Sequence, residues 1–484
     1  MHIQVLAQKD TLGDDIYSAT GLDEYGMDDE YDDIFNSSSA EDSFQHATLV
    51  ATLAEKFTLT SFKPFQKTII TTALEGRDTL VIQPTGSGKS LCFQFIPVYL
   101  KKKAIIVTPT ISLMQDQVHK LNSIGISSVL LGSAQLDKQV EVHALKPGSR
   151  EHLIFVTPEW ITKPANQPRL HSLIQANELS LIAIDEAHLF TEWNDFRSAF
   201  SNLRKLKSDF PSIPIMALTA TATANVEEDI KLLLRNPITS KNSMNRPNVT
   251  LNVEELPHNK STPPVISFAK RAAEIIDSTS SIIYTDFIAD IGPIVSALQE
   301  IGVEAVGYHG EMDAPSRQES YVKWKSGQVQ TIVATKAFGM GIDKPDIRHV
   351  IRNGVPESML SWAQELGRAG RDGIQACATI LYHKTDMGHA NPWVLNNLSD
   401  QDRCKRILSS FSESWKYVYA HLAGICRRRL HLDLFGEQTS EPVATGDCCD
   451  VCCSQTGDDK VDYKEELEVL IDAMNHVGGR VRLR

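Results

Sequence analysis

Continuous apolar runs recur along residues 49–247, and each is followed by a polar or glycine-containing turn and then by a helical pattern. Strands that are buried on both faces of a parallel sheet have this unbroken apolar character. The alternation predicts a doubly wound α/β domain over this range. The predicted strands are DTLVIQ (78–83), KAIIVTP (103–109), HLIFVTP (152–158), LSLIAID (179–185) and IPIMALTA (213–220).

A second series of the same kind predicts another doubly wound α/β domain over 248–388, joined to the first near NRPNVTLNV (245–253). In such sheets the active residues lie at the carboxyl ends of the strands. The predicted strands are SSIIYTD (280–286), VEAVGYHG (303–310), VQTIVAT (329–335), RHVIRNG (348–354) and ACATILYH (376–383).

The strand signal ends after residue 388. Helical patterns around 400–424 lead to the cysteine-rich segment CCDVCC (448–453), which favours a small helical subdomain over 389–457. A last amphipathic helix, YKEELEVLIDAMNHVGG, is predicted within 458–484.

The composition adds few surprises. The chain has 484 residues, of which 42% are hydrophobic and 23% charged, as in ordinary soluble globular proteins. No uncharged apolar run approaches the ~20 residues that cross a bilayer, and the N-terminal residues lack a signal-peptide pattern. We therefore expect an intracellular protein with no membrane partner.

The net charge of −13 is unevenly distributed. Residues 1–50 hold twelve acidic residues and one lysine, so the other 434 residues carry only −2. We expect residues 1–48 to form an acidic disordered tail, because they have no apolar periodicity. The tail is either simply solvated or docks on a basic partner through Tyr25, Tyr31, Ile34 and Phe35. The global charge therefore does not exclude a nucleic-acid partner.

VIQPTGSGKSLCF (81–93) places a strand, a glycine-rich turn and a helix start in succession. Gly86 and Gly88 let the loop from Thr85 to Ser90 turn its N–H groups toward phosphate oxygens. Lys89 supplies charge for the terminal phosphates, and the Ser90 hydroxyl can bind Mg²⁺. Gln83 occupies the position of the first glycine in the strict pattern, so a chance match is the alternative.

LIAIDEAH (181–188) ends an apolar strand in Asp185 and Glu186. One carboxylate there can join the Mg²⁺ shell, and the other can orient or deprotonate an attacking water. In the second domain, Arg368 and Arg371 are three residues apart, which places them on one helix face. They are candidate arginine fingers for the γ-phosphate; the alternative is a basic surface patch.

Aromatic residues follow the acidic pair. Trp193 and Phe196, next to Arg197, are either packed core or a loop that stacks on unpaired bases at ~1–3 kcal/mol per base. Five of the eight cysteines come after residue 425. In a chain without a secretion signal, this clustering favours a metal over disulfides.

These motifs resemble the RecQ family of superfamily 2 DNA helicases, in the family's order from about residue 60 to 453. The resemblance also rests on SFKPFQ (61–66), TPTISLMQDQV (108–118), ALTATAT (217–223), YHGEM (308–312), ATKAFGMGIDKPDIR (334–348) and QELGRAGRDG (364–373). It implies two RecA-like domains, a zinc-binding subdomain and a 3′-to-5′ DNA helicase that uses ATP and Mg²⁺ in DNA repair, recombination or replication.

The resemblance also assigns roles to single residues. Gln66 matches the residue that reads adenine, and Lys63 stands where the family usually has an arginine that stacks on adenine. Ser87 lies in the matching phosphate loop. His188 matches the residue that couples the ATP state to DNA. Thr219 and Thr221 match a motif that links the two lobes.

The zinc subdomain is implied by CRRRLHLDLFGE (426–437) and by the cysteines that follow it. The expected ligands are Cys426, Cys448, Cys449 and Cys452, with Cys453 spare; Gly446 stands where a family cysteine is usual. Cys92, Cys377 and Cys404 are expected to be buried small hydrophobic residues.

Some stretches depart from the family pattern. Glu192 replaces a glutamine before the tryptophan, Leu189 and Phe190 replace Cys-Ile, and IIYTDFIAD (282–290) lacks the usual Cys and Ser-Arg. Residues 458–484 match only the start of a winged helix, so translocation and ATP hydrolysis are expected, whereas the efficiency of duplex opening is left open. The alternatives are a DNA-stimulated ATPase that anneals or remodels DNA, and an RNA helicase. A nuclear location is expected from the substrate class.

Overall fold

The computed structural model describes residues 40–133, 135, 137–189, 203, 205–257, 261–336, 338, 344–389, 401–437 and 447–454. Two compact units, residues 1–52 and 53–484, divide the chain. Helix α1 (Ala40–Phe57) crosses that boundary. It begins inside the segment that was expected to lack structure, since the apolar Leu49 and Leu53 recur at helical spacing.

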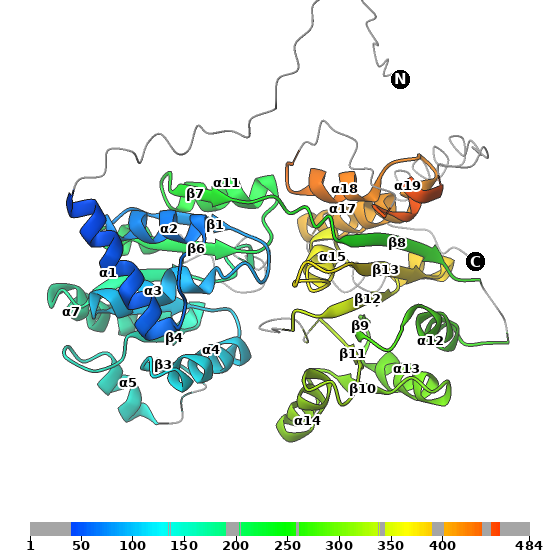
Figure 1. The fold of residues 1–484 in the computed structure, drawn as a ribbon, viewed down its shortest axis with the longest axis horizontal. Helices are drawn as coiled ribbons and strands as arrows, with labels where there is room; N and C mark the ends of the chain where they lie inside the picture. Colours follow the sequence, from blue (N-terminus) through cyan, green and yellow to red (C-terminus); the bar gives the residue numbers. More distant parts are fainter. Residues whose placement is uncertain are drawn as a thin grey trace, which may run out of the picture. The chain divides into compact units, whose positions relative to one another are not determined.

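Within the described residues, the first sheet has seven strands, all parallel, in the order β3-β4-β2-β5-β6-β1-β7 (Figure 1). The five predicted strands are all present, whereas β3 and β7 were not predicted. Both form the edges of the sheet, where most of their residues are only half-buried and no continuous apolar run is needed. The strands are β1 (Thr79–Ile82), β2 (Lys103–Val107), β3 (Ser128–Leu130), β4 (Leu153–Val156), β5 (Leu179–Ile184), β6 (Ile215–Thr219) and β7 (Ile238–Lys241).

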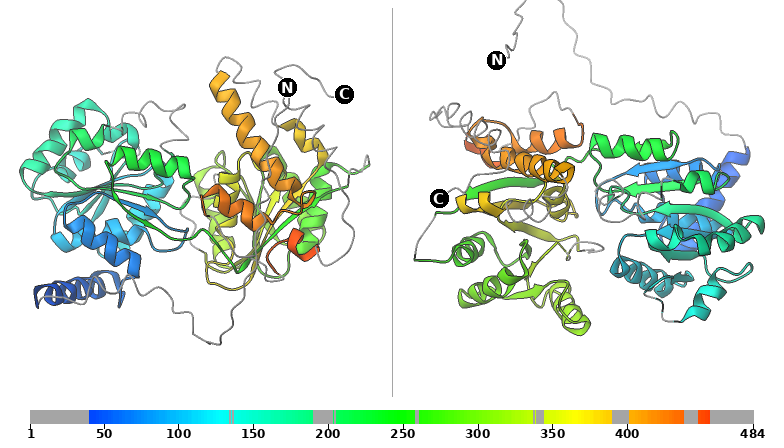
Figure 2. Two further views of the ribbon diagram at one scale, coloured as in Figure 1. Left: turned by 90° about the horizontal axis from the view of Figure 1, so that it is seen from above. Right: turned by 180° about the vertical axis from the view of Figure 1, so that it is seen from behind.

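Helices pack on both faces of the first sheet (Figure 2). The face that carries Leu80 and Ile82 shares one apolar core with Leu170 of α7 and Val226 of α11. Helices α2 and α3 contact strands β1, β2 and β5 from the other face. The helices are α2 (Pro64–Leu74), α3 (Ser90–Leu100), α4 (Ile111–Ser123), α5 (Lys138–Ala144), α6 (Pro158–Ile161), the 3-10 helix η2 (Pro164–Asn166), α7 (Gln167–Gln175), α10 (Leu206–Asp209) and α11 (Ala224–Leu233).

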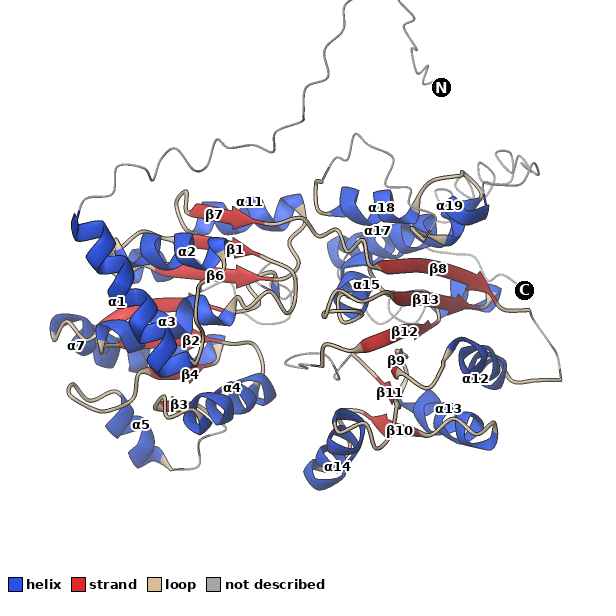
Figure 3. Ribbon diagram, viewed as in Figure 1, coloured by secondary structure: helices blue, strands red, loops and turns tan. Residues whose placement is uncertain are grey.

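The second sheet, as far as it is described, has six parallel strands in the order β10-β11-β9-β12-β13-β8 (Figure 3). The connection between the two domains lies before Val249, because the later part of the predicted junction (245–253) belongs to strand β8. Its polar residues suit an edge strand and conceal it in the sequence. The strands are β8 (Val249–Glu255), β9 (Ser280–Tyr284), β10 (Ala305–Tyr308), β11 (Thr331–Ala334), β12 (Ile347–Asn353) and β13 (Ala376–Tyr382).

Two apolar cores cover the two faces of this sheet. Phe268 of α12 and Ile294 of α13 belong to the core on one face. Trp324 of α14, Trp362 of α15 and Trp415 of α17 belong to the core on the other face. The helices are α12 (Pro264–Ile275), α13 (Ile288–Glu300), α14 (Ala314–Lys325), α15 (Met359–Leu366), the 3-10 helices η3 (Lys384–His389) and η4 (Tyr419–His421), α17 (Gln401–Val418), α18 (Arg427–Leu434) and α19 (Asp450–Ser454).

The described residues of the C-terminal helices pack into the cores of the two α/β domains. Cys448, Cys449 and Val451 pack in the same core as Trp415 and the second sheet. Leu432 and Phe435, at the other end of this segment, pack in the core of the first domain. Helix α18 and the turn after it therefore touch both α/β domains. Among the described helices, none combines the length and apolar character needed to cross a bilayer.

Candidate nucleotide site and cysteine cluster

The glycine-rich loop lies between β1 and α3 at the carboxyl end of the strand. Gly86 and Gly88 have φ values of 81° and 92°, which side chains other than glycine rarely adopt. Gln83 is fully buried, and its side-chain amide donates to the Ser240 hydroxyl of β7 at 3.2 Å. The departure from the strict pattern at Gln83 thus leaves the loop intact, because that side chain points into the sheet.

Lys89 lies inside the loop. Its ammonium group donates to the carbonyls of Gln83 at 2.7 Å and of Pro84 at 3.1 Å. Burial lowers the pKa of Lys89, while Glu186 and Asp185 oppose that shift. An ammonium group held by uncharged carbonyls is well placed to exchange them for phosphate oxygens.

Two residues at the start of α2, Lys63 and Gln66, brace the loop from outside. Lys63 donates from its ammonium to the Ser87 carbonyl at 2.8 Å, and the Gln66 amide donates to the Gly88 carbonyl at 2.9 Å. A Cβ atom added to Gly88 would lie 2.8 Å from Nε2 of Gln66. These contacts hold the loop in place, and base recognition by Gln66 and Lys63 stays a prediction.

The acidic pair follows β5 directly. The Asp185 backbone N–H donates to the Val107 carbonyl at 2.9 Å, which fixes the pair at the end of strand β2. Burial raises the pKa of Asp185 to about 7, with a further contribution from the neighbouring Glu186 carboxylate. Glu186 adopts a φ of 53°, a conformation that is uncommon outside glycine and asparagine. The backbone therefore stores strain at this position.

The donors here suit Mg²⁺, which prefers hard oxygen ligands. The half-buried Asp185 carboxylate and the Ser90 hydroxyl line one cavity with Lys89. A carboxyl group whose ionised form is disfavoured by burial gains most from a nearby divalent cation. The two predicted Mg²⁺ ligands are thus brought together, and their binding of the ion stays a prediction.

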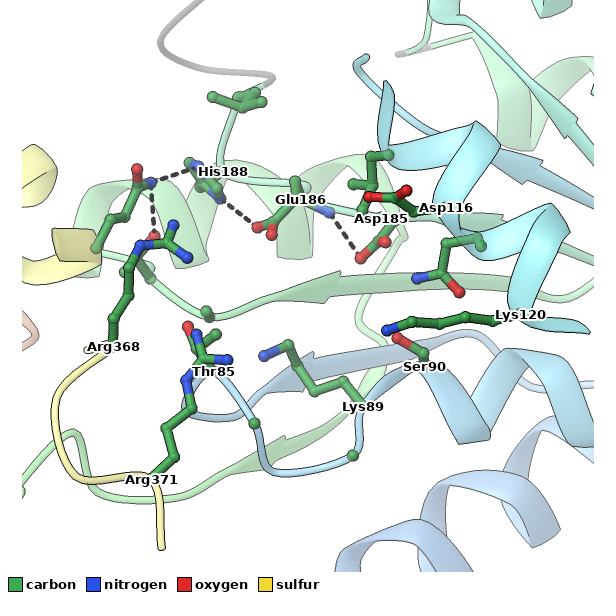
Figure 4. A pocket seen from close by; sticks show the side chains of 18 residues that line it. Thr85, Lys89, Ser90, Asp116, Lys120, Asp185, Glu186, His188, Arg368 and Arg371 are labelled. Atoms are coloured by element: carbon green, nitrogen blue, oxygen red, sulfur yellow. Dashed lines mark hydrogen bonds and ion pairs between the residues drawn. The ribbon is translucent and has the colours of Figure 1, made fainter. Parts of the chain in front are cut away.

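The cavity has a volume of about 310 Å³ and both domains line it (Figure 4). From the second domain, Arg371 projects toward Thr85 and the glycine-rich loop, and Arg368 projects toward the side of the cavity where His188 lies. The expectation that they share a helix face was wrong, because α15 ends at Leu366 and both lie in the turns that follow. Arg371 lies so close to the loop that a Cβ atom on Gly86 would be 3.1 Å from its Cδ.

His188 links the acidic pair to the second domain. One ring nitrogen, Nδ1, lies 2.9 Å from the Thr219 hydroxyl and 3.4 Å from a Glu186 carboxylate oxygen. The other, Nε2, lies 2.9 Å from the amide nitrogen of Gln364 on α15. Gln364 is also 3.4 Å from the Thr221 hydroxyl. A continuous polar chain therefore runs from the acidic pair across the domain boundary.

Several residues that line the cavity were not predicted from the sequence. Asp116, Gln117 and Lys120 come from α4, and Gln364 comes from α15. All but Lys120 lie in stretches that carried the family resemblance, TPTISLMQDQV and QELGRAGRDG, yet no role was assigned to them. Burial raises the pKa of Asp116.

The four expected zinc ligands, Cys426, Cys448, Cys449 and Cys452, come together. Their sulfur atoms all lie within 4.8 Å of one another, whereas Cys453 is exposed. Four converging thiols, buried or half-buried, are the donor set of a structural tetrahedral zinc site. As expected, Cys92 is buried, but Cys377 is only half-buried, and the side chain of Cys404 lies outside the described residues.

Arg428 anchors this cysteine cluster to the second sheet. Its guanidinium group donates to Sγ of Cys448 at 3.3 Å and to the carbonyls of Arg246 and Val249 at 2.6 Å each. The Leu251 N–H of β8 donates to the Cys448 carbonyl at 3.2 Å. The cluster is thus fastened to the strand that begins just after the junction between the domains.

The predicted DNA-sensing residues Trp193, Phe196 and Arg197 lie outside the described residues, as do Glu192 and Phe190. The segments 1–39 and 455–484 lie outside them as well. The roles proposed for these residues stay predictions. Leu189, the last described residue before that loop, is buried.

Comparison with known proteins decides the family. A DEAD/DEAH box helicase model matches residues 63–229, and a helicase conserved C-terminal domain model matches residues 266–373. The ATP-dependent DNA helicase Q1 of Rattus norvegicus is 33% identical over 438 residues, which cover 88% of this chain and 68% of that protein. The chain belongs to the RecQ family of DNA helicases.

Two further RecQ-type relatives support this assignment. The putative ATP-dependent DNA helicase Q1 of Caenorhabditis briggsae is 35% identical over 75% of this chain and 62% of that protein. The ATP-dependent DNA helicase RecQ of Haemophilus influenzae is 33% identical over 88% of this chain and 65% of that protein. The chain thus spans roughly two thirds of the length of these relatives.

Solved structures support the fold alone. The helicase MrfA bound to DNA and AMPPNP matches with a TM-score of 0.59 at 21% identity, over 73% of this chain and 52% of that one. Dbp5 of S. cerevisiae bound to RNA and ADP BeF3 matches with a TM-score of 0.55 at 17% identity, over 76% and 91%. Both are helicases, so the two α/β domains have the RecA-like fold that was predicted.

Proposed function

We propose that this RecQ-family protein is an ATP-dependent 3′-to-5′ DNA helicase that hydrolyses ATP on single-stranded DNA and opens duplex or branched DNA. The observation that carries the proposal is the composition of the cavity. It combines a phosphate-binding loop and an acidic pair from one domain with two arginines from the other. Such a cavity can couple nucleotide hydrolysis to relative movement of the two domains.

In the proposed mechanism, the N–H groups of the loop from Thr85 to Ser90 cradle the phosphates, and Lys89 neutralises their negative charge. Mg²⁺, when held by Ser90 and Asp185, neutralises charge on the phosphates. The water that attacks the γ-phosphate is oriented by Glu186, whose carboxylate borders the cavity. Arg371 and Arg368 stabilise the charge of the transition state from the second domain.

The phosphate groups of ATP attract positively charged side chains of both domains to one place in the cavity. When the γ-phosphate leaves, the arginines lose their partner and the contact between the domains loosens. The chain of hydrogen bonds through His188 and Gln364 would transmit this change to the acidic pair. Nucleic acid enters through the aromatic loop, where Trp193 and Phe196 stack on bases and Arg197 contacts the backbone.

Zn²⁺ is the metal we propose for the four cysteines. It would fasten α18 and α19 to the second sheet, and it takes no part in hydrolysis. A substrate of this class places the protein in the nucleus, in repair, recombination or replication of DNA.

ATP hydrolysis is measured alone, with single-stranded DNA and with single-stranded RNA, beside strand displacement on duplexes with a 3′ or a 5′ tail. We expect stimulation by DNA and displacement only from the 3′ tail. Lys89→Ala should abolish hydrolysis, while Lys146→Ala, which removes an exposed lysine of the same domain, should not. Stimulation by RNA alone would overturn the proposed substrate, and DNA-stimulated hydrolysis without displacement would favour annealing or remodelling instead.

A further inference from the structure

An ion cluster of the second domain joins two buried residues, Arg352 and Glu365, to the more exposed Asp286, and it takes no part in the mechanism above. It consists of Arg352, Asp286 and Glu365. Arg352 is on β12 and is almost completely buried. Its guanidinium group donates to Glu365 at 2.5 Å and to both carboxylate oxygens of Asp286 at 2.6 Å.

The three residues come from three elements of the second domain. Arg352 pairs in register with Tyr284 near the end of β9, and Asp286 follows that strand by two residues. Glu365 belongs to α15, which runs along the boundary between the domains. The cluster therefore ties the carboxyl ends of two neighbouring strands to one helix.

Helix α15 contacts both domains through different faces. Met359, Trp362 and Leu366 pack in the core of the second sheet, whereas Leu360 and Ala363 pack with the core of the first domain. Neighbouring residues of a helix project about 100° apart. Apolar contacts alone would allow α15 to rotate slightly about its axis. The hydrogen bond from Arg352 to the Glu365 carboxylate restricts this rotation.

The residues beside Glu365 are the ones that reach the nucleotide cavity. Gln364, immediately before it, contacts His188 and Thr221 of the first domain. Arg368 follows one turn later, and its backbone N–H donates to the Glu365 carbonyl at 3.1 Å. The orientation of Glu365 thus sets where Gln364, Arg368 and then Arg371 project.

The contact between Asp286 and Arg352 also indicates a role for a stretch that departs from the family pattern. It lies in IIYTDFIAD, which lacks the usual Cys and Ser-Arg. In this chain the stretch instead supplies a carboxylate to a buried arginine. Buried charges are tolerated when they are paired and hydrogen-bonded, and losing one partner of such a pair is costly.

We propose that the Asp286–Arg352–Glu365 cluster is a positioning device, which holds α15 in the orientation that brings Gln364, Arg368 and Arg371 to the nucleotide. The proposal rests on the proposed function, because it concerns the same cavity. None of the three residues touches that cavity. Their effect is expected to be indirect, on the rate of hydrolysis rather than on the affinity for nucleotide.

The test compares Glu365→Leu, which removes the acceptor of the Arg352 hydrogen bond, with Glu365→Gln, which keeps a carbonyl oxygen at the same place. Glu365→Leu should lower kcat for ATP hydrolysis by about tenfold or more, with KM for ATP within about threefold of the wild type. Glu365→Gln should retain kcat within about threefold. Arg271→Lys, at a half-exposed ion pair with Glu254 in the same domain, is the matched control and should leave both constants unchanged.

Hydrogen exchange gives a readout that does not depend on hydrolysis. Backbone amides of 359–371 should exchange faster in Glu365→Leu than in the wild type, with α13 unchanged. If the wild type itself hydrolyses no ATP, the proposed function fails, and the exchange of 359–371 still decides the positioning role. Unchanged kcat and exchange in Glu365→Leu would overturn the inference. So would a parallel loss of kcat, KM and thermal stability in both Glu365 variants, since that pattern indicates only a folding defect.

Discussion

Replacing Gly86 by alanine tests whether Arg371 acts at the glycine-rich loop. Gly86 has a φ of 81°, and its added Cβ would lie 3.1 Å from Cδ and 3.7 Å from Nε of Arg371. Gly76 offers a matched control, because it has the same φ of 81° and no neighbouring atom within 4 Å of an added Cβ. The two substitutions share the backbone strain and differ in the contact with Arg371.

The expected magnitudes follow from this geometry. A left-handed conformation costs a residue other than glycine roughly 1–2 kcal/mol, so both variants should lose about this much free energy of unfolding. In Gly86→Ala the Arg371 side chain must also move by a few tenths of an ångström to reach ordinary contact. Since a displacement of ~1 Å can cost about 100-fold in rate, we expect kcat for ATP hydrolysis to fall by about tenfold.

Thermal unfolding and steady-state ATP hydrolysis measure the two effects separately. Gly76→Ala should lose stability and keep its kcat. The Arg371→Ala background identifies the route, because Gly86→Ala should lower kcat further there by less than about twofold if it acts through Arg371. An action of Arg371 at the loop is contradicted if Gly86→Ala hydrolyses ATP as fast as Gly76→Ala, or if its loss of kcat is fully additive with that of Arg371→Ala.

Three further predictions concern stability. Phe435→Ala should lower the free energy of unfolding by about 3–5 kcal/mol, because it empties a buried position between α18 and the core of the first domain. Denaturant titration measures this loss, and a value near zero would show that the end of α18 does not pack on the first domain. Zinc analysis should find one equivalent of zinc in the wild type and none in Cys448→Ser. With free zinc at about a thousand times its Kd, removal of the metal by a chelator should lower the free energy of unfolding by about 4 kcal/mol. Identical melting with and without chelator would contradict a structural metal. Burial raises the pKa of Glu365 from 4.5 to about 7; the Arg352 charge opposes this shift, and Asp286 and Glu357 add to it. The stability that protonated Glu365 contributes is therefore present below pH 4.5 and is lost as the pH rises through 7. Relative to Glu365→Gln, the wild type should therefore gain roughly 3 kcal/mol between about pH 8 and about pH 4.5, and parallel melting profiles of the two proteins would argue against this.

Much of the architecture could be read from the order of residues along the chain. Parallel strands buried on both faces require unbroken apolar runs, so strands such as LIAI and IIVT stand out without any structure. The edge strands β3, β7 and β8 were missed because an edge needs fewer apolar residues, and pairing with a neighbour decides them. The residues of the nucleotide site were found for a similar reason, since the loop that holds Lys89 and the pair Asp185 and Glu186 follow strands whose carboxyl ends meet at one edge of a sheet.

The sequence by itself determined which groups carry chemistry: a glycine-rich phosphate loop, an acidic pair and four cysteines, each with local spacing that its chemistry demands. Only the tertiary structure decided how distant groups meet. It placed Arg371 against Gly86, joined Gln364 to His188 across the domain boundary, and used Arg352 to connect Asp286 with Glu365. Such contacts depend on how helix α15 is seated between two domains, and this packing is set by side chains far apart in the chain, which no local pattern records.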